Sequence, residues 1–303
     1  MTQQLRKFEF GSQLAGPRLL ITGCVHGDEF EPIAAIRRLV TLFEHDDRAV
    51  SDFRGTVTLI PVVNESAFLR GHRCGDDGLD LARTCPGRSD GSVTEQTAWA
   101  LSEAIRSVDY YIDLHTGGTE LGVYPLAGYM LHTNPNVLKT QRRMAKAFNL
   151  PVVWGTSAAL DGRSLSVARD ANIPAIYCEY LGSATCDPAG VDAYVDGCLN
   201  VMSELEMLDR ERPGSRVSHV VEDYRPNAGH MQVCNPSPVT GYFETNVKLG
   251  DGVRQGDVLG TIYPLDGSTS AVVRATESGI VIVLRTFPRV HAGESVGVVL
   301  EIQ

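Results

Sequence analysis

Apolar runs and helix-spaced apolar positions alternate along the first two thirds of the chain. Residues 18–23 form a β-prone run, and residues 28–43 then carry apolar side chains at helical spacing. The alternation continues, with strands expected over 56–63, 110–114 and 173–179 and helices over 94–108 and 138–148. This rhythm predicts an α/β domain with a mixed sheet flanked by helices, whose ligands bind beyond the carboxyl ends of the strands.

The pattern changes near residue 225. The helical spacing of residues 191–208 gives way to short strand-like runs separated by glycine turns. Two similar halves, VKLGDGVRQGDVLGTI and SGIVIVLRTFPRVHAGESVGVVLEI, resemble the β-sandwich of lipoyl/biotinyl domains. We therefore expect one domain over residues 1–225 and a β-sandwich, or lipoyl/biotinyl-like barrel, over residues 226–303. The hairpin between the halves, PLDGSTSAV, has no acceptor lysine, so a carrier function is not expected.

The composition of the chain limits the kinds of molecule that we expect it to bind. A chain of 303 residues with a net charge of −10 lacks the basic character that phosphate binding requires, which argues against nucleic acid. No segment approaches the ~18 consecutive apolar residues of a membrane span. The N-terminus has no apolar secretory stretch, and the seven cysteines are scattered and odd in number. We expect a cytoplasmic protein that acts on a small molecule, with a homo-oligomer as one option.

Candidate metal ligands follow two of the expected strands. His26 and Glu29, in GCVHGDEFEP, come directly after the first strand. His115, in YIDLHTGG, lies at the end of another strand, 86 residues after Glu29. Two imidazoles and one carboxylate form a common catalytic zinc set that leaves a position for water. Glu179 follows the apolar strand IPAIYC, where its carboxylate could take a proton from that water.

Four motifs occur in an order that resembles the succinylglutamate desuccinylase/aspartoacylase family: HGDE, DLARTCPG, DLHT and CEYLG. The resemblance implies a zinc carboxypeptidase-like fold in residues 1–225 and an appended β-sandwich. It also implies one zinc ion per chain, held by His26, Glu29 and His115, and a water activated by Glu179. The expected activity is deacylation, the hydrolysis of the amide of a small N-acyl amino acid.

Three loop arginines also match the family, and the resemblance gives each a role. Arg73 would polarise the scissile carbonyl and stabilise the oxyanion, Arg83 would pair with the substrate carboxylate, and Arg163 would help to bind an anionic or polar group. One position departs from the family pattern, because Ala82 replaces the asparagine of Asp-Leu-Asn-Arg. The missing amide permits a different substrate.

Two alternatives remain open from the sequence. The same zinc chemistry would serve a carboxypeptidase or amidase that cuts a peptide-like amide, because the metal does not specify the leaving amine. A non-catalytic metal-binding protein would keep the ligands without turnover, although a carboxylate at Glu179 argues against it.

Overall fold

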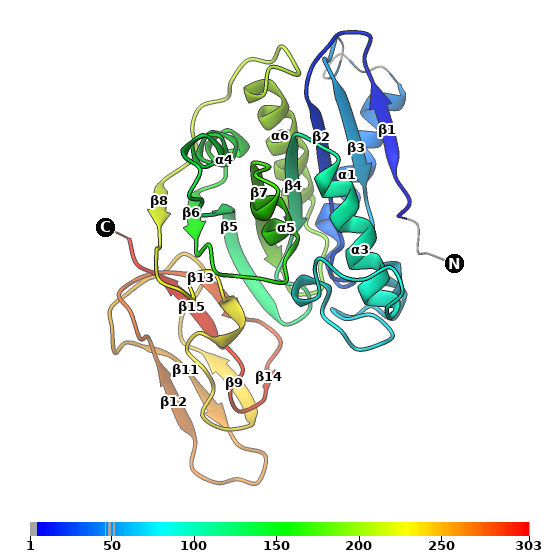
Figure 1. Cartoon of the computed structure of the whole chain (residues 1–303). Helices are drawn as coiled ribbons and strands as arrows, with labels where there is room; N and C mark the ends of the chain where they lie inside the picture. Colours follow the sequence, from blue (N-terminus) through cyan, green and yellow to red (C-terminus); the bar gives the residue numbers. More distant parts are fainter. Residues whose placement is uncertain (1–4, 46, 48–49, 51, 303) are drawn as a thin grey trace.

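The computed structural model describes residues 5–45, 47, 50 and 52–302, and a mixed β-sheet forms its centre (Figure 1). Its middle strands run parallel, in the spatial order β3 (Thr56–Ile60), β2 (Arg18–Thr22), β4 (Tyr110–His115) and β7 (Ala175–Gly182). β1 (Phe8–Gly11) pairs antiparallel with β3 at one edge. The parallel strands are almost wholly buried, as expected where helices cover both faces of a sheet.

The sheet divides beyond β7, along the long strand β5 (Leu121–Met130), which pairs antiparallel with β7. The second half of β5 pairs with β6 (Val152–Thr156), and β6 pairs with β8 (His219–Glu222). The first half of β5 pairs instead with β13 (Gly279–Arg285), far along the chain. One strand therefore connects the sheet both to its own edge and to the C-terminal region.

Helices cover the two faces of the sheet unequally (Figure 1). One buried core cluster contains residues of α1 (Glu31–Glu44), α4 (Pro135–Phe148) and α6 (Pro188–Glu204), and both α1 and α4 contact α6. A second cluster contains residues of α3 (Val93–Arg106) and α5 (Ser164–Asp170), which contact each other. The short helix α2 (Glu65–Arg70) follows β3. The expected mixed sheet flanked by helices is thus confirmed.

The C-terminal strands form two layers. β9 (Gly241–Thr245), β11 (Val258–Tyr263), β12 (Ala271–Arg274) and β14 (Arg289–Val290) make a separate antiparallel sheet. β10 (Gly252–Val253) and β15 (Gly297–Leu300) pair with β13 and so join the main sheet. One apolar cluster contains residues from both layers, including Ile262 and Val281. The second sheet agrees with the expected β-sandwich, although its partner layer is hydrogen-bonded to β5.

Most elements expected from the pattern are present with shifted ends. The helix expected from residue 28 begins at Glu31, because Pro32 favours the first turn of a helix and Asp28 accepts a hydrogen bond from the amide of Thr119 instead (2.8 Å). The boundary at residues 225 and 226 falls in the loop after β8 and stays a prediction. In the described part of the chain, no helix has the length and apolar character to cross a membrane.

Candidate active site

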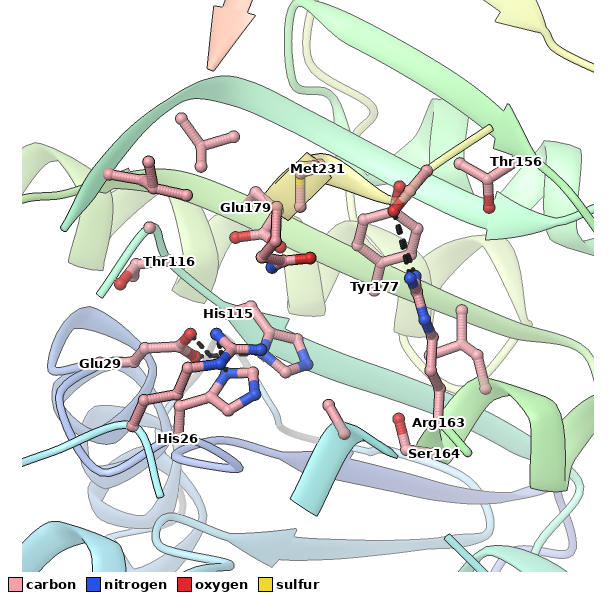
Figure 2. Close-up of a pocket in the computed structure, with 18 of the residues that line it drawn as sticks. His26, Glu29, His115, Thr116, Thr156, Arg163, Ser164, Tyr177, Glu179 and Met231 are labelled. Carbon is pink, nitrogen blue, oxygen red and sulfur yellow. Dashed lines mark hydrogen bonds and ion pairs between the residues drawn. The ribbon is translucent and has the colours of Figure 1, made fainter. Parts of the chain in front are cut away.

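The carboxyl edge of the parallel strands brings His26, Glu29 and His115 together (Figure 2). His26 and Glu29 lie in the turn between β2 and α1, and His115 ends β4, the parallel neighbour of β2. Each side chain offers one ligand atom, and these atoms all lie within 4.8 Å of one another. The three residues grouped by the sequence therefore form a cluster that could hold a metal ion.

The Glu29 carboxylate lies between the two imidazole rings. Its Oε1 is 2.7 Å from Nδ1 of His26, and its Oε2 is 3.1 Å from Nδ1 of His115. Burial by itself would raise the pKa of Glu29, but the two adjacent histidines outweigh this effect and hold the pKa below its usual range. The carboxylate is thus kept ionised although it is only 1% exposed.

Two further carboxylates lie next to the Nε2 atoms of the two histidines and orient the imidazole rings. Oδ1 of Asp80 lies 3.2 Å from Nε2 of His26, and Oδ2 of Asp113 lies 3.1 Å from Nε2 of His115. Asp113 is itself fully buried and accepts hydrogen bonds from Thr22 Oγ1 (2.7 Å) and from Ser164 Oγ. With each Nε2 directed at a carboxylate, the Nδ1 atoms are left to bind a metal, an arrangement typical of protein zinc sites.

The orienting carboxylate Asp113 can be tested by removing its charge. We expect Asp113→Asn to lower metal affinity by roughly 10- to 100-fold, the usual cost of losing a group that orients a metal-binding histidine. Competition with a chelator measures the change. Asp109→Asn serves as the control, because Asp109 directly precedes β4 and is paired with Arg18 on the surface. Equal metal affinity in the two variants would refute the orienting role.

Glu179 lies beside this cluster, on the neighbouring strand. It stands opposite His115 in the register between β4 and β7, and it lines the same pocket. The residue is 5% exposed, and its Oε2 has no hydrogen-bond partner among the described residues. Burial raises the pKa of Glu179 above its usual range. A raised pKa makes the ionised carboxylate a stronger base, and its unpartnered oxygen is open to a proton from a water molecule.

The three predicted arginines all line the pocket, but their surroundings differ. Arg73 is paired with Asp80, whose Oδ2 accepts from Nε (3.0 Å), and its Nη1 lies 3.4 Å from Nδ1 of His26. Arg73 therefore lies next to the cluster that could hold a metal ion.

Arg83 and Arg163 lie farther along the pocket, in 3-10 helix η1 (Leu81–Arg83) and at the start of α5. Burial lowers the pKa of Arg163 to about 10, with a smaller contribution from the positive charge of Arg83. Two guanidinium groups that repel each other in one pocket favour an anionic ligand between them.

Several pocket residues were not singled out from the sequence. Tyr177 shares the face of β7 with Glu179, because alternate residues of a strand point the same way. Gly229, Met231 and Gln232 come from the C-terminal region, at and before 3-10 helix η2 (Met231–Val233). Only the strand position of Tyr177 offered a signal, since the loop around η2 has no periodic pattern. Figure 2 shows Met231 and Tyr177 among the residues that line this pocket with Glu179 and Arg163.

Comparison with known proteins identifies the family of this chain. The model of the succinylglutamate desuccinylase/aspartoacylase catalytic domain matches residues 15–205, a range that includes the cluster of His26, Glu29 and His115, Glu179 and the three arginines. The chain belongs to this family. The family expected from the four motifs is thereby confirmed.

Individual relatives cover nearly the whole chain. N-alpha-acetyl-L-2,4-diaminobutyric acid deacetylase of Halomonas elongata is 30% identical over 294 residues, spanning 95% of this chain and 83% of the relative. The product-bound ectoine utilization protein EutE of Ruegeria pomeroyi superposes with a TM-score of 0.85 at 26% identity, covering 97% of this chain and 87% of that one. A succinylglutamate desuccinylase/aspartoacylase of Rhodobacter sphaeroides gives 0.85 at 25% identity, with 99% and 88% covered. Deacylase relatives support a hydrolytic function for this member of the family.

Proposed function

We propose that this protein is a zinc-dependent hydrolase that cleaves the amide of a small N-acyl amino acid into a carboxylate and a free amine. The observation that carries the proposal is the convergence of His26, Glu29 and His115 beside Glu179, a buried carboxyl with an unpartnered oxygen. The deacetylase from Halomonas elongata, which matches 95% of this chain, supports an amide substrate of this kind.

The donor set fits zinc. Two imidazole nitrogens and one carboxylate oxygen are the ligands of many catalytic zinc sites, and Asp80 and Asp113 direct Nδ1 of each histidine toward that position. One bound zinc ion per chain would lower the pKa of a water and polarise the acyl carbonyl of the substrate.

Glu179 would transfer the proton, and Arg73 would stabilise the negative charge that develops on the carbonyl oxygen. Glu179 accepts a proton from the attacking water as the oxygen bonds to the carbonyl carbon, and it then passes that proton to the departing amine nitrogen. Its position opposite His115, without a competing hydrogen-bond donor on Oε2, leaves it free for this exchange. The guanidinium of Arg73, held by Asp80 next to His26, donates hydrogen bonds to the developing oxyanion.

Arg83 and Arg163 would hold the carboxylate of the amino-acid part. They line the same pocket as His26, Glu29 and His115. A planar guanidinium can bind a carboxylate through two parallel hydrogen bonds. Ala82 precedes Arg83 and lines the same pocket, and its side chain supplies no polar group. The anion contacts in this chain must therefore come from the arginines and from other residues of the pocket wall.

A substrate panel tests the proposal. Zinc-loaded protein is incubated with N-acetyl and N-succinyl amino acids, with N-alpha-acetyl-L-2,4-diaminobutyrate and with dipeptides, and free amine is measured. We expect release from at least one N-acyl amino acid and a lower kcat/KM for every dipeptide. Cleavage of dipeptides in preference would identify the carboxypeptidase-like alternative, and no release from any compound would contradict hydrolysis of this substrate class.

A further inference from the structure

The segment Gly229–Gln232 reaches from the C-terminal region into the pocket and touches both of the outer arginines. The carbonyl oxygen of Gly229 accepts from both Nη atoms of Arg163, at 3.3 Å each. Oε1 of Gln232 accepts from Nη2 of Arg83 at 2.9 Å. A segment far along the sequence thus contacts both side chains and orients them.

Both acceptors are neutral, which matters for the charge of the pocket. Arg73 has an ion-pair partner in Asp80. By contrast, no carboxylate among the described residues lies within ion-pair distance of Arg83 or Arg163. A carbonyl or an amide oxygen orients a guanidinium without cancelling its charge, so both arginines keep their positive charge for a ligand.

The side-chain amide of Gln232 has N–H donors that no described residue uses. Its Oε1 is used by Arg83, and no described residue accepts a hydrogen bond from its Nε2. The side chain lines the pocket together with Ala82, whose small methyl group leaves room next to Arg83. An amide N–H beside a guanidinium that has no ion-pair partner is well placed for one oxygen of a bound anion.

The position of Gln232 is fixed by the C-terminal sheets. Its carbonyl oxygen accepts from the amide of Ser295 at 3.2 Å. The nearby Asn235 is buried, with Oδ1 accepting from the amide of Thr276 (3.0 Å) and Nδ2 donating to the carbonyl of Gly297 (3.0 Å). These contacts hold the backbone from which the Gln232 side chain extends, so less of the segment has to be ordered when a substrate binds.

We infer that Gln232 is a substrate-binding residue, which orients Arg83 through Oε1 and donates from Nε2 to the carboxylate of the substrate. The inference rests on the proposed function and extends it, because it makes the C-terminal region part of the substrate site. Specificity for the amino-acid carboxylate then depends on a residue outside the catalytic-domain match at 15–205.

The test compares Gln232→Ala and Gln232→Glu with the wild type, using the panel compound of highest kcat/KM and its uncharged carboxamide. Loss of one hydrogen bond to a charged group should raise KM for the carboxylate substrate by roughly 10- to 100-fold in Gln232→Ala, with kcat within about 3-fold. Gln232→Glu should raise that KM further, because its carboxylate would neutralise Arg83 and repel the substrate. KM for the carboxamide should rise much less in both variants.

Gln255→Ala is the control, since Gln255 lies in an exposed turn and bonds to Ser278 through its backbone amide. A KM in Gln232→Ala within 2-fold of the wild type, or a loss confined to kcat, would overturn the inference while leaving the proposed function intact. If the wild type hydrolyses no panel compound, the proposed function fails separately. Calorimetric titration with N-acetyl-L-alanine then decides, because equal or absent binding in wild type and Gln232→Ala also overturns the role of Gln232.

Discussion

Replacing Glu179 by glutamine should lower kcat at least ~100-fold while zinc content stays at the wild-type level. Glutamine keeps the size and much of the hydrogen bonding of glutamate, but it cannot accept the proton of the attacking water. Glu179 is buried opposite His115 and is not one of the three clustered ligands. The variant should therefore lose turnover but keep its zinc. Steady-state kinetics and elemental analysis of the same sample measure the two properties.

Glu31→Gln provides a matched control for this variant. Like Glu179, Glu31 is buried and has one carboxylate oxygen without a described hydrogen-bond partner, but it does not line the pocket. Its kcat should remain near that of the wild type. Near-normal kcat in Glu179→Gln, or loss of zinc from it, would mean that Glu179 is not the separate proton carrier proposed.

His115→Ala should remove most of the bound metal, and activity should disappear with it. The substitution deletes one of the three proposed ligands and leaves Asp113 buried without its imidazole partner. A site with one imidazole and one carboxylate binds zinc far more weakly than the complete set. Elemental analysis after dialysis measures the metal, and free-amine release measures the activity.

His132→Ala is the matched control for the histidine substitution. His132 bonds to the backbone carbonyl of Arg169 and does not line the pocket, so this variant should keep wild-type metal content. A full equivalent of metal in His115→Ala would show that the ligand assignment is wrong.

The cluster at the sheet edge could be anticipated because it follows from local pattern. His26, Glu29, His115 and Glu179 all come at or just after apolar strands, and parallel strands place their carboxyl ends at one edge. Strand periodicity and the four motifs together therefore located these residues without any knowledge of long-range contacts.

Other features depend on contacts that a local pattern does not encode. The sequence pattern did not predict β5, because Gly122, Pro125 and Gly128 interrupt its apolar run. Its pairing with β13 joins segments that are more than 150 residues apart in the sequence. Asp80 and Asp113 were visible within the quoted motifs, but their roles emerge only from the distances to the histidines. Gln232 reaches Arg83 across 149 residues of sequence, in a segment with no periodic pattern.

Titration of metal-free protein with zinc tests the central claim most directly, with free-amine release from the best panel substrate as the readout. If His26, Glu29 and His115 form one catalytic zinc site, chelated protein should be inactive, and activity should rise linearly until one equivalent of zinc per chain has been added. Full activity in the chelated, metal-free protein, with no change on addition of zinc, would contradict the account.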